Sequence, residues 1–301
     1  MGERIVECVP NFSEGRRKEV IDQIVGAMAA VPGVRVLDVH SDADHNRSVV
    51  TMVGEPEAVE EAAFRGIAKA AQLIDMDEHR GQHPRMGAAD VVPFVPVRGV
   101  TMAECAEMAR RLGERVGREL GIPVYLYGEA ATRPERRDLA AVRRGEYEGL
   151  KAEIEVNPRR APDFGPRRLG KAGATAIGAR PPLIAFNVYL GTDDVGIAKA
   201  IARAVRHSSG GLRYVKALGL LVEGRAQVSM NLTDYRRTPI HRVMEMIRRE
   251  AARYGVAVVS SEIVGLVPNE ALVDAARFYL QLDGFSSDQI LENRLASAKD
   301  Q

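Results

Sequence analysis

The chain alternates between two hydrophobic periods, and its first half contains both. Valine and isoleucine cluster in short runs that suit strands, and longer segments carry apolar residues three and four positions apart, as amphipathic helices do. These periods predict strands at residues 5–9, 34–39, 48–53 and 90–97 and helices at residues 17–30 and 56–74. Pro93 and Pro96 fall within the last strand, so we expect it at an edge or rim of the sheet rather than at its centre.

The second half of the chain repeats this order of elements. Strands are predicted at residues 183–190, 215–222, 227–232 and 256–260, and helices at 193–206 and 238–254. Strand, helix, strand, strand, helix, strand is the ferredoxin-like arrangement, an antiparallel sheet with helices on one face. The pattern therefore predicts an α+β fold with two ferredoxin-like units, residues 1–180 and 181–301, whose uncovered sheet faces oppose each other across a cleft. Additional helices are expected at residues 102–120, 139–154 and near the C-terminus.

Two arginine-rich segments lie outside this repeat. Residues 157–182 are rich in proline, glycine and arginine and connect the two predicted units. A connection this long and this poor in apolar residues is usually functional or disordered. Between residues 133 and 144, arginine alternates with Glu135, Asp138 and Ala140, which is typical of a solvated helix face.

Composition narrows the class of protein. Hydrophobic residues make up 46% and charged residues 28%, which excludes a disordered chain, and a formal net charge of +1 gives no global attraction to nucleic acid. No run approaches the roughly 20 apolar residues of a membrane span, and the N-terminus lacks the basic and apolar regions of a signal peptide. Cys8 and Cys105 both lie in apolar stretches, as expected of reduced thiols. We therefore expect a soluble cytoplasmic protein without nucleic-acid or membrane partners.

The densest group of polar residues lies at positions 79–87, where the sequence reads His-Arg-Gly-Gln-His-Pro-Arg-Met-Gly. It lies between a predicted helix and a predicted strand, and is either an exposed basic turn or a functional loop. If it is functional, His79, His83 and Asp90 offer metal ligands, but Gly81 interrupts a helical face and no complete ligand motif is present. General acid–base catalysis by a histidine, with arginines that bind carboxylates, fits these residues better.

Two further polar clusters are candidates for the same site. Residues 38–47 combine aspartate, histidine, asparagine and arginine. Most of them fit a polar turn, but Asp38 and His40 alternate along a strand and would face the same side of the sheet, where they could line the cleft. Residues 163–173 are rich in glycine, and from residue 155 to 180 basic residues outnumber acidic ones by six to two. This segment is either a flexible linker or a loop that lies over a flat ligand and binds carboxylates, and it lacks the phosphate-loop motif.

At these clusters the chain resembles the glutamate formimidoyltransferase family, which in animals forms the N-terminal part of formimidoyltransferase-cyclodeaminase. The resemblance covers essentially the whole chain and implies two ferredoxin-like subdomains. It rests on blocks that occur in the family's order, namely 7–15, 75–76, 83–87, 123–129, 161–165 and 264–268.

The resemblance also implies roles for particular residues. His83, immediately before Pro-Arg-Met-Gly, is the expected catalytic residue. The expected folate-binding stretch is Gly165, Pro166, Arg167, Arg168, Leu169, Gly170, Lys171, Ala172 and Gly173. Position 40 carries histidine where aspartate is expected in the animal enzymes, so another carboxylate would have to assist. The candidates for assisting or substrate-binding roles are Glu7, Asn11, Asp38, His40, Arg47, Arg85 and Arg180.

The implied reaction is reversible transfer of a formimino group from N-formimino-L-glutamate to tetrahydrofolate, which gives 5-formimino-tetrahydrofolate and L-glutamate. Tetrahydrofolate acts as co-substrate, and no metal is required. A neutral His83 takes a proton from the attacking folate nitrogen and returns it to the departing glutamate nitrogen. Besides these small molecules, the expected partners are a second copy of the chain in a homodimer and, because the chain ends at Gln301, a separate cyclodeaminase.

Three alternative functions stay open from the residues alone. The first is a related folate-dependent formyl transferase or cyclising enzyme that acts on 5-formyl-tetrahydrofolate. The second is a non-catalytic binder of folate or nucleic acid, since ferredoxin-like sheets often bind RNA, although only 5% of residues are aromatic and tryptophan is absent. The third is a metal hydrolase.

Overall fold

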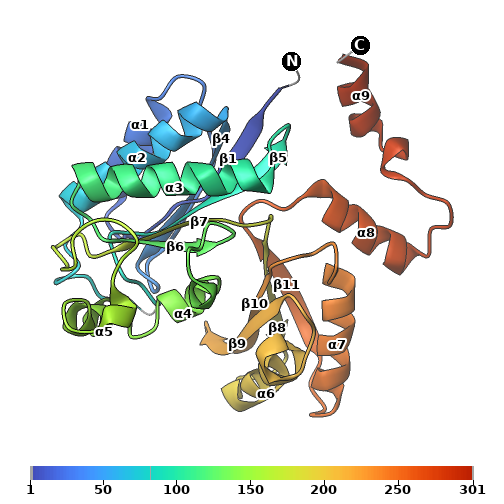
Figure 1. Cartoon of the computed structure of the whole chain (residues 1–301). Coiled ribbons are helices and arrows are strands. Elements are labelled where there is room, and N and C mark those ends of the chain that lie inside the picture. The colour runs from blue at the N-terminus through green and yellow to red at the C-terminus, as the bar shows by residue number, and fades with distance from the viewer. Residues whose placement is uncertain (1–2, 82, 300–301) are drawn as a thin grey trace. The chain divides into compact units, whose positions relative to one another are not determined.

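The computed structural model describes residues 3–81 and 83–299. Contacts between Cα atoms separate them into two compact units, the first ending at Pro181 and the second beginning at Pro182 (Figure 1). Both units combine helices with a β-sheet, as the α+β prediction requires. No helix in the described part of the chain is long and apolar enough to cross a membrane.

The first unit is built on a mixed sheet. Its strands run in space from β3 through β4 to β1 and β2, which lie one after the other between β4 and β5, and continue through β7 to β6. The pairs β5–β7 and β6–β7 are parallel and the other pairs are antiparallel. The strands are β1 (Ile5–Cys8), β2 (Asn11–Phe12), β3 (Arg35–Asp42), β4 (Arg47–Gly54), β5 (Ala89–Arg98), β6 (Val124–Gly128) and β7 (Thr175–Ala179).

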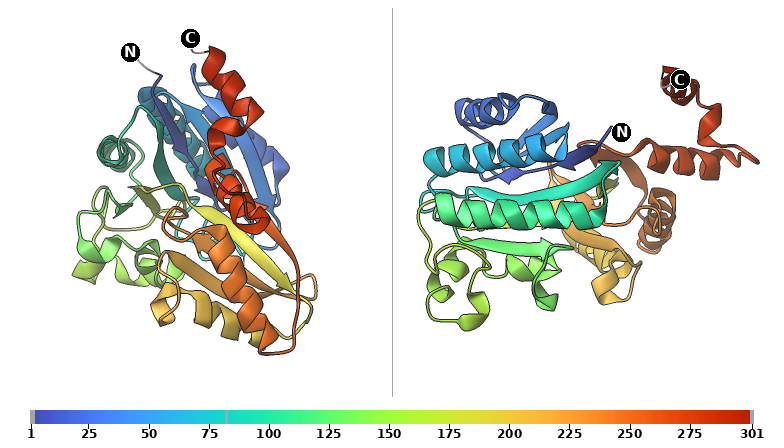
Figure 2. Two further views of the ribbon diagram at one scale, coloured as in Figure 1. Left: turned by 90° about the vertical axis from the view of Figure 1, so that its right-hand side faces the viewer. Right: turned by 45° about the horizontal axis from the view of Figure 1, so that its top comes forward.

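Three long helices cover one face of this sheet: α1 (Lys18–Ala29), α2 (Pro56–Leu73) and α3 (Met102–Glu119). Their apolar stripes pack with the sheet into one core that includes Ile24, Phe94 and Leu112, each fully buried. Thr101 starts α3 with a capping box, in which its hydroxyl accepts a hydrogen bond from the Glu104 N–H and the Glu104 carboxylate accepts one in return. Figure 2 shows these helices on the same side of the sheet in both views.

The other face is also covered at the β6 and β7 end, by α4 (Leu139–Val142) and α5 (Glu146–Glu153). The prediction that helices lie on one face was therefore wrong for this part of the sheet. Tyr125 and Tyr127 of β6 point to the face opposite Leu126, so both faces of that strand are apolar and both need a cover. Residues 139–154 form two helices rather than the single one predicted, because Gly145 between them has a left-handed φ of 82°.

β5 lies inside the sheet, between β1 with β2 on one side and β7 on the other, so the prediction of an edge strand was wrong. The Pro93 carbonyl accepts a hydrogen bond from the Val9 N–H, so its ring nitrogen points to the break between β1 and β2. The Phe94 carbonyl accepts from the Arg180 N–H at the end of the β7 pairing. Pro96 follows Phe94 by two residues, so its ring nitrogen also faces the β7 side, beyond the end of the β5–β7 pairing. Both prolines thus place their missing N–H where pairing is interrupted or has ended.

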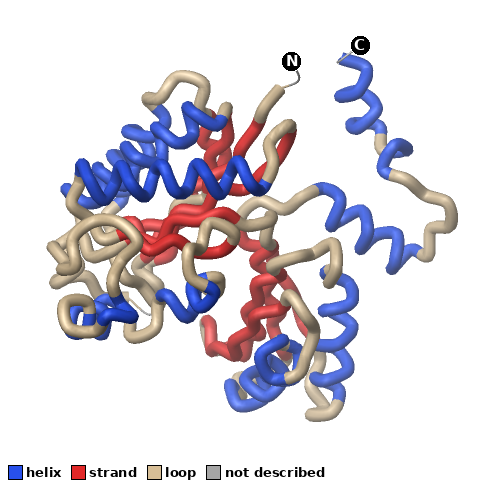
Figure 3. Tube along the Cα trace, in the orientation of Figure 1, coloured by secondary structure: helices blue, strands red, loops and turns tan. Residues whose placement is uncertain are grey.

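The second unit has an antiparallel sheet with strand order β11, β8, β10, β9, drawn in red in Figure 3. Helices α6 and α7 pack against it around Ile201, Val228 and Ile247, which are fully buried. The strands and helices predicted here are confirmed apart from their ends. The elements are β8 (Ile184–Leu190), α6 (Val195–Val205), β9 (Val215–Val222), β10 (Arg225–Leu232), α7 (Ile240–Ala252), β11 (Val258–Val264), α8 (Asn269–Leu280) and α9 (Leu291–Lys299).

Candidate active site

His83 lies in the loop between α2 and β5, half-buried beside the first residue of β4. Its Nδ1 atom is 2.7 Å from Nη1 of Arg47 and 2.7 Å from the Pro84 carbonyl oxygen. The same guanidinium donates through Nε to the Asn11 side-chain oxygen at 3.1 Å. The fold thus brings His83 together with Asn11 and Arg47, two of the residues predicted to assist it.

A buried carboxylate, that of Asp90, holds this group in place. Its side chain is only 1% exposed, and its Oδ2 accepts hydrogen bonds from Arg47, at 3.1 Å, and from Arg143. Its Oδ1 accepts from the Met86 N–H at 3.0 Å, three residues after His83. One carboxylate therefore joins β4, the C-terminal cap of α4 and the loop between α2 and β5 that carries His83, which we call the histidine loop.

A β-bulge accounts for the position of Asp90. Asn11 pairs with Val91 in β5, but the next residue, Phe12, pairs with Ala89, so Asp90 is an extra residue in the strand. A bulge of this kind turns a side chain away from the direction that strict alternation would give it. The carboxylate can therefore meet the guanidinium groups although Val92 of the same strand lies in the helix-covered core.

These surroundings keep His83 neutral. Burial, followed by the positive charges of Arg47 and Arg143, lowers the pKa of the His83 imidazole to about 3, against the opposing effect of Asp90. Burial and the neighbouring Arg143 also lower the pKa of Arg47 to about 10, which leaves its guanidinium charged at neutral pH. The site therefore pairs a neutral imidazole with a positive charge.

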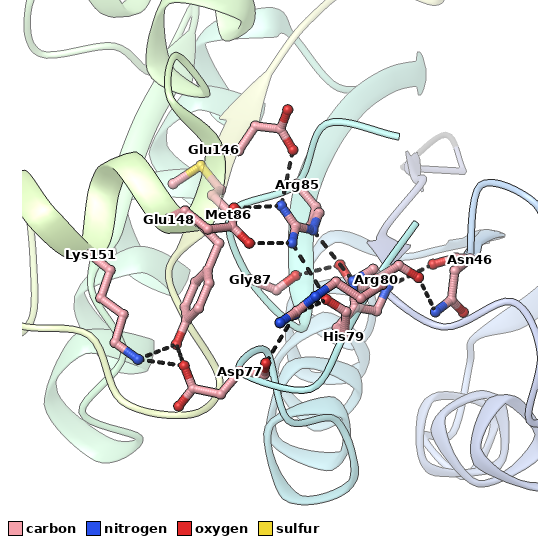
Figure 4. A network of polar contacts seen from close by, with 12 residues as sticks. Asn46, Asp77, His79, Arg80, Arg85, Met86, Gly87, Glu146, Glu148 and Lys151 are labelled. Carbon is pink, nitrogen blue, oxygen red and sulfur yellow. Dashed lines mark hydrogen bonds and ion pairs between the residues drawn. The ribbon is translucent and has the colours of Figure 1, made fainter. Parts of the chain in front are cut away.

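Helix α5 fixes the part of the loop that follows His83, and Figure 4 shows Arg85 of this part bound to Glu146 and Glu148. Both nitrogens Nη1 and Nη2 of Arg85 donate to the Glu148 carboxylate, at 2.8 and 2.6 Å, and Nη1 also reaches Glu146 at 3.0 Å. The Tyr147 N–H donates to the Arg85 carbonyl at 2.9 Å. Because the Arg85 guanidinium is occupied by these carboxylates, we leave it out of the substrate-binding group.

The part of the loop that precedes His83 is fixed as well. Asp77 accepts hydrogen bonds from the Tyr147 hydroxyl at 2.8 Å and from Lys151 (Figure 4). His79 is buried, and its Nε2 is 3.0 Å from the Asn46 carbonyl oxygen. The histidine considered as a metal ligand with His83 is thus turned toward the protein backbone. Among the described residues, no group of three histidine, cysteine or acidic side chains is arranged to hold a metal ion.

The proposed folate loop, residues 165–173, lies directly beside the histidine loop. The Ala174 N–H donates to the Met86 carbonyl at 2.9 Å, and the Ala88 N–H donates to the Ala172 carbonyl at 2.8 Å. Gly87 is required at this crossing, because a Cβ atom there would lie 2.1 Å from the Ala174 oxygen. Two segments that are far apart in the sequence, and that were both expected to act, are thus in backbone contact.

The side chains of this loop divide into anchors and exposed groups. Leu169 and Ala172 pack against the core, Arg167 donates through Nε to the Ile154 carbonyl at 2.9 Å, and Lys171 pairs with Asp75 at 2.7 Å. Arg168 is exposed and forms no hydrogen bond or ion pair with any described residue. The backbone of Gly165 is left-handed, with φ 82°, as is that of Gly173, with φ 69°. Pro166 is half-buried, and Gly170 is exposed and accepts a hydrogen bond from the Gly173 N–H at 2.9 Å.

The remaining candidates lie elsewhere on the sheet. Glu7 points to the face opposite the core residues Val6 and Cys8, and burial raises the pKa of its carboxyl, against the positive charge of Arg180. Asp38 and His40 lie on the outer strand β3, and neither side chain bonds to a described residue. They therefore stand apart from the group around His83.

Two functional neighbours were missed by the sequence reasoning. The first is Arg143, which binds Asp90 and belongs to the segment interpreted as a solvated helix face. That interpretation was wrong for Arg143, and it was also wrong for Arg136 in the same segment. Arg136 is buried and pairs with Asp163 at 2.6 Å. Asp90 was considered only as a metal ligand, although an aspartate inside a run of apolar residues signals a buried partner of opposite charge.

Comparison with known proteins gives the chain a family. The model of the formiminotransferase domain, N-terminal subdomain, matches residues 5–180, and the model of the formiminotransferase domain matches residues 185–295. A glutamate formimidoyltransferase of Thermoplasma acidophilum is 55% identical over 298 residues, 98% of each chain. One of Streptococcus pyogenes serotype M1 is 50% identical and covers 97% of this chain and 99% of its own.

The animal relatives are longer. The formimidoyltransferase-cyclodeaminase of Mus musculus is 49% identical over 286 residues, which are 92% of this chain and 52% of the mouse protein. Matches of this extent confirm the resemblance found in the sequence: the chain belongs to the formiminotransferase domain family.

Proposed function

We propose that this chain transfers a formimino group between N-formimino-L-glutamate and tetrahydrofolate, giving 5-formimino-tetrahydrofolate and L-glutamate. Relatives named glutamate formimidoyltransferase, at 50 to 55% identity over nearly the whole chain, support this activity. The observation that supports a role for particular residues in this activity is the backbone contact between the histidine loop and residues 165–173. A folate held by the second loop would lie next to His83.

His83 then acts as the base and the acid of one reaction. As the folate nitrogen attacks the amidine carbon, a new carbon–nitrogen bond forms and the imidazole takes the proton that this nitrogen loses. The imidazole returns the proton to the glutamate nitrogen as its bond to the same carbon breaks. The low pKa of His83 supports the first step, because the free enzyme holds the imidazole in its neutral form.

Two positive groups of the first unit suit the carboxylates of the two substrates. Arg47 lies against the imidazole, and Arg180 lies near Glu7 on the same sheet face, so these are the proposed carboxylate ligands. Asn11 holds Arg47 through its side-chain oxygen and acts as a support. We assign binding of the folate tail to residues 165–173, with Arg168 as the cation free to meet it.

Several broader proposals accompany this function. The reaction would belong to histidine degradation and one-carbon metabolism in the cytoplasm. The mouse relative is named for a transferase and a cyclodeaminase together, so a separate cyclodeaminase is the proposed consumer of the product here, and the active form is proposed to be a homodimer.

We also infer that the chain has two ferredoxin-like subdomains, the first ending at residue 180 and the second beginning at residue 181. The strand orders β3-β4-β1-β5 and β9-β10-β8-β11, both antiparallel, support the subdomain fold.

A donor comparison tests the function itself. Purified protein with tetrahydrofolate and N-formimino-L-glutamate should form 5-formimino-tetrahydrofolate, measured by absorbance, with no added metal. N-formyl-L-glutamate, or 5-formyl-tetrahydrofolate offered as a substrate for cyclisation, should react far more slowly. Faster reaction of a formyl compound would favour the alternative of a formyl transferase or cyclising enzyme. Folate binding with no turnover of either donor would favour a non-catalytic folate binder.

Substitution of His83 tests its proton transfer. His83→Ala should lower turnover by about 10²–10⁴-fold, the usual contribution of a positioned acid–base group, with a smaller change in folate affinity. His79→Ala is the control: it should keep most of its turnover per folded molecule but unfold at lower temperature, because it loses a buried hydrogen bond. Near-normal turnover in the His83 variant, or inactivity confined to the His79 variant, would contradict the assignment.

The pH dependence of kcat/KM should follow the low pKa of His83. A base with a pKa of about 3 stays unprotonated as the pH falls from about 8 to 5, so His83 should add no acidic loss of rate there. Arg143→Met removes a positive charge that disfavours the imidazolium, so it should raise this pKa and shift an acidic loss of rate to higher pH. A wild-type profile that rises through about pH 6.5, unchanged in the variant, would oppose this description of the site.

The folate loop predicts a preference for long folate tails. Arg168→Ala should weaken binding of polyglutamylated tetrahydrofolate more than of the monoglutamate, because extra carboxylates need a free cation. The difference should be about 0.2–1 kcal/mol, as for exposed ion pairs, and should shrink as salt is added. Arg159→Ala, which removes an exposed arginine outside the loop, should affect neither ligand. Equal loss for both folates at every salt concentration would argue against the role of Arg168.

A further inference from the structure

Two groups compete for one atom of His83. Nδ1 lies 2.7 Å from Nη1 of Arg47, which can only donate a hydrogen bond, and 2.7 Å from the Pro84 carbonyl oxygen, which can only accept one. An imidazole nitrogen carries either a lone pair or a proton. The bond from Arg47 requires the lone pair and the bond to Pro84 requires the proton, so the two bonds exclude each other.

The bond from Arg47 prevails in the free enzyme. The guanidinium is charged at neutral pH, and hydrogen bonds that involve a charged donor are about twice as strong as neutral ones. The Pro84 carbonyl belongs to an exposed residue, so water can replace His83 as its partner at little cost. Nδ1 therefore carries the lone pair, and the single proton of the neutral ring lies on Nε2.

This tautomer cannot do the chemistry proposed for His83. Nε2 forms no hydrogen bond with any described residue, which makes it the nitrogen open to a substrate. With a proton already on Nε2, the ring has no lone pair there to accept the proton of the attacking folate nitrogen. The base becomes active only when Nδ1 holds the proton and donates a hydrogen bond to the Pro84 carbonyl oxygen. Nε2 then carries the lone pair.

Building on the proposed function, we propose that Arg47 is a positioning residue that holds His83 in its inactive Nε2–H tautomer until a substrate carboxylate takes the Nη1 donor. The carboxylate then accepts the bond that Nη1 gave to Nδ1. Water, which reaches the half-buried ring, removes the proton from Nε2 and delivers one to Nδ1, with no change in net charge. The amino-acid substrate thus activates its own base.

The other bonds of Arg47 suit this exchange. Nε and Nη2 donate to the Asn11 oxygen, and one Nη1 hydrogen serves Asp90, so the guanidinium keeps its place when its second Nη1 hydrogen changes partner. Its side chain is 15% exposed, so part of it is open to solvent. Arg143 shares Asp90 but does not contact His83, and provides a matched comparison.

Nitrogen-15 NMR of the full-length protein, with labelled histidine at neutral pH, tests the proposal. His83, identified by its absence in His83→Gln, should carry its proton on Nε2 in the free wild type and on Nδ1 with saturating L-glutamate. Arg47→Met should show the Nδ1–H tautomer without glutamate. Arg143→Met and Arg47→Lys, which keep a donor beside Nδ1, should both retain Nε2–H in the absence of glutamate.

A wild type with the same tautomer in both states would overturn the proposal, and so would an Arg47→Met variant that keeps Nε2–H. The wild-type comparison needs no substitution of Arg47, so a failure of Arg47→Met to fold leaves the test intact. The NMR experiment determines the tautomer of His83 without any turnover, whereas the donor assay measures only turnover. Failure of this coupling is therefore distinguishable from failure of the proposed function.

Discussion

The buried carboxylate of Asp90 is the constraint on which the site depends. It accepts hydrogen bonds from two guanidinium groups and from the backbone of the histidine loop. These donors belong to β4, to the residue that caps α4 and to the segment after His83. Loss of one partner of a buried ion pair costs about 3–5 kcal/mol, because the remaining charge stays buried without compensation. Here two charges would be left, that of Arg47 beside the imidazole and that of Arg143 next to Arg47. Asp90 thus allows two cations to lie close together near the neutral imidazole.

Most of the fold was predictable because its long elements follow simple periods. The four strands and two helices of the second unit appear where alternation and helical spacing place them, with differences only at their ends. β5 was misplaced because sequence shows that a proline lacks an N–H but not which side of the strand that nitrogen faces. Pro93 faces the break between β1 and β2, and such a break is a property of the neighbouring strand. The strands β6 and β7 were not predicted, for a related reason. Each is stabilised by the strand that pairs with it, and the sequence of a strand does not show its partner.

The candidate site was predictable in part, and the part that was missed is electrostatic. His83 and the loop 165–173 were found by resemblance to a family, and the structure adds the backbone contact between them. Arg143 looked like a solvated residue because its neighbours in the sequence are charged, yet its partner is Asp90, 53 residues away. Spacing along the chain carries no information about such a pair. The bulge that aims Asp90 depends on the register between β2 and β5, which sequence reasoning did not address.

The arrangement answers a conflict that the proposed chemistry creates. Substrates rich in carboxylates require positive charge close to the reacting atoms, whereas a base near neutral pH requires an unprotonated imidazole. A half-buried ring with guanidinium groups nearby meets both needs, because burial, followed by the same charges that attract carboxylates, lowers the pKa of the ring to about 3. The disadvantage is that a base with so low a pKa accepts a proton weakly. A bound carboxylate would partly neutralise Arg47 and so raise the pKa of His83 while the substrate is present. His83 would then be a stronger base, and the charge of the substrate would be part of the catalytic apparatus.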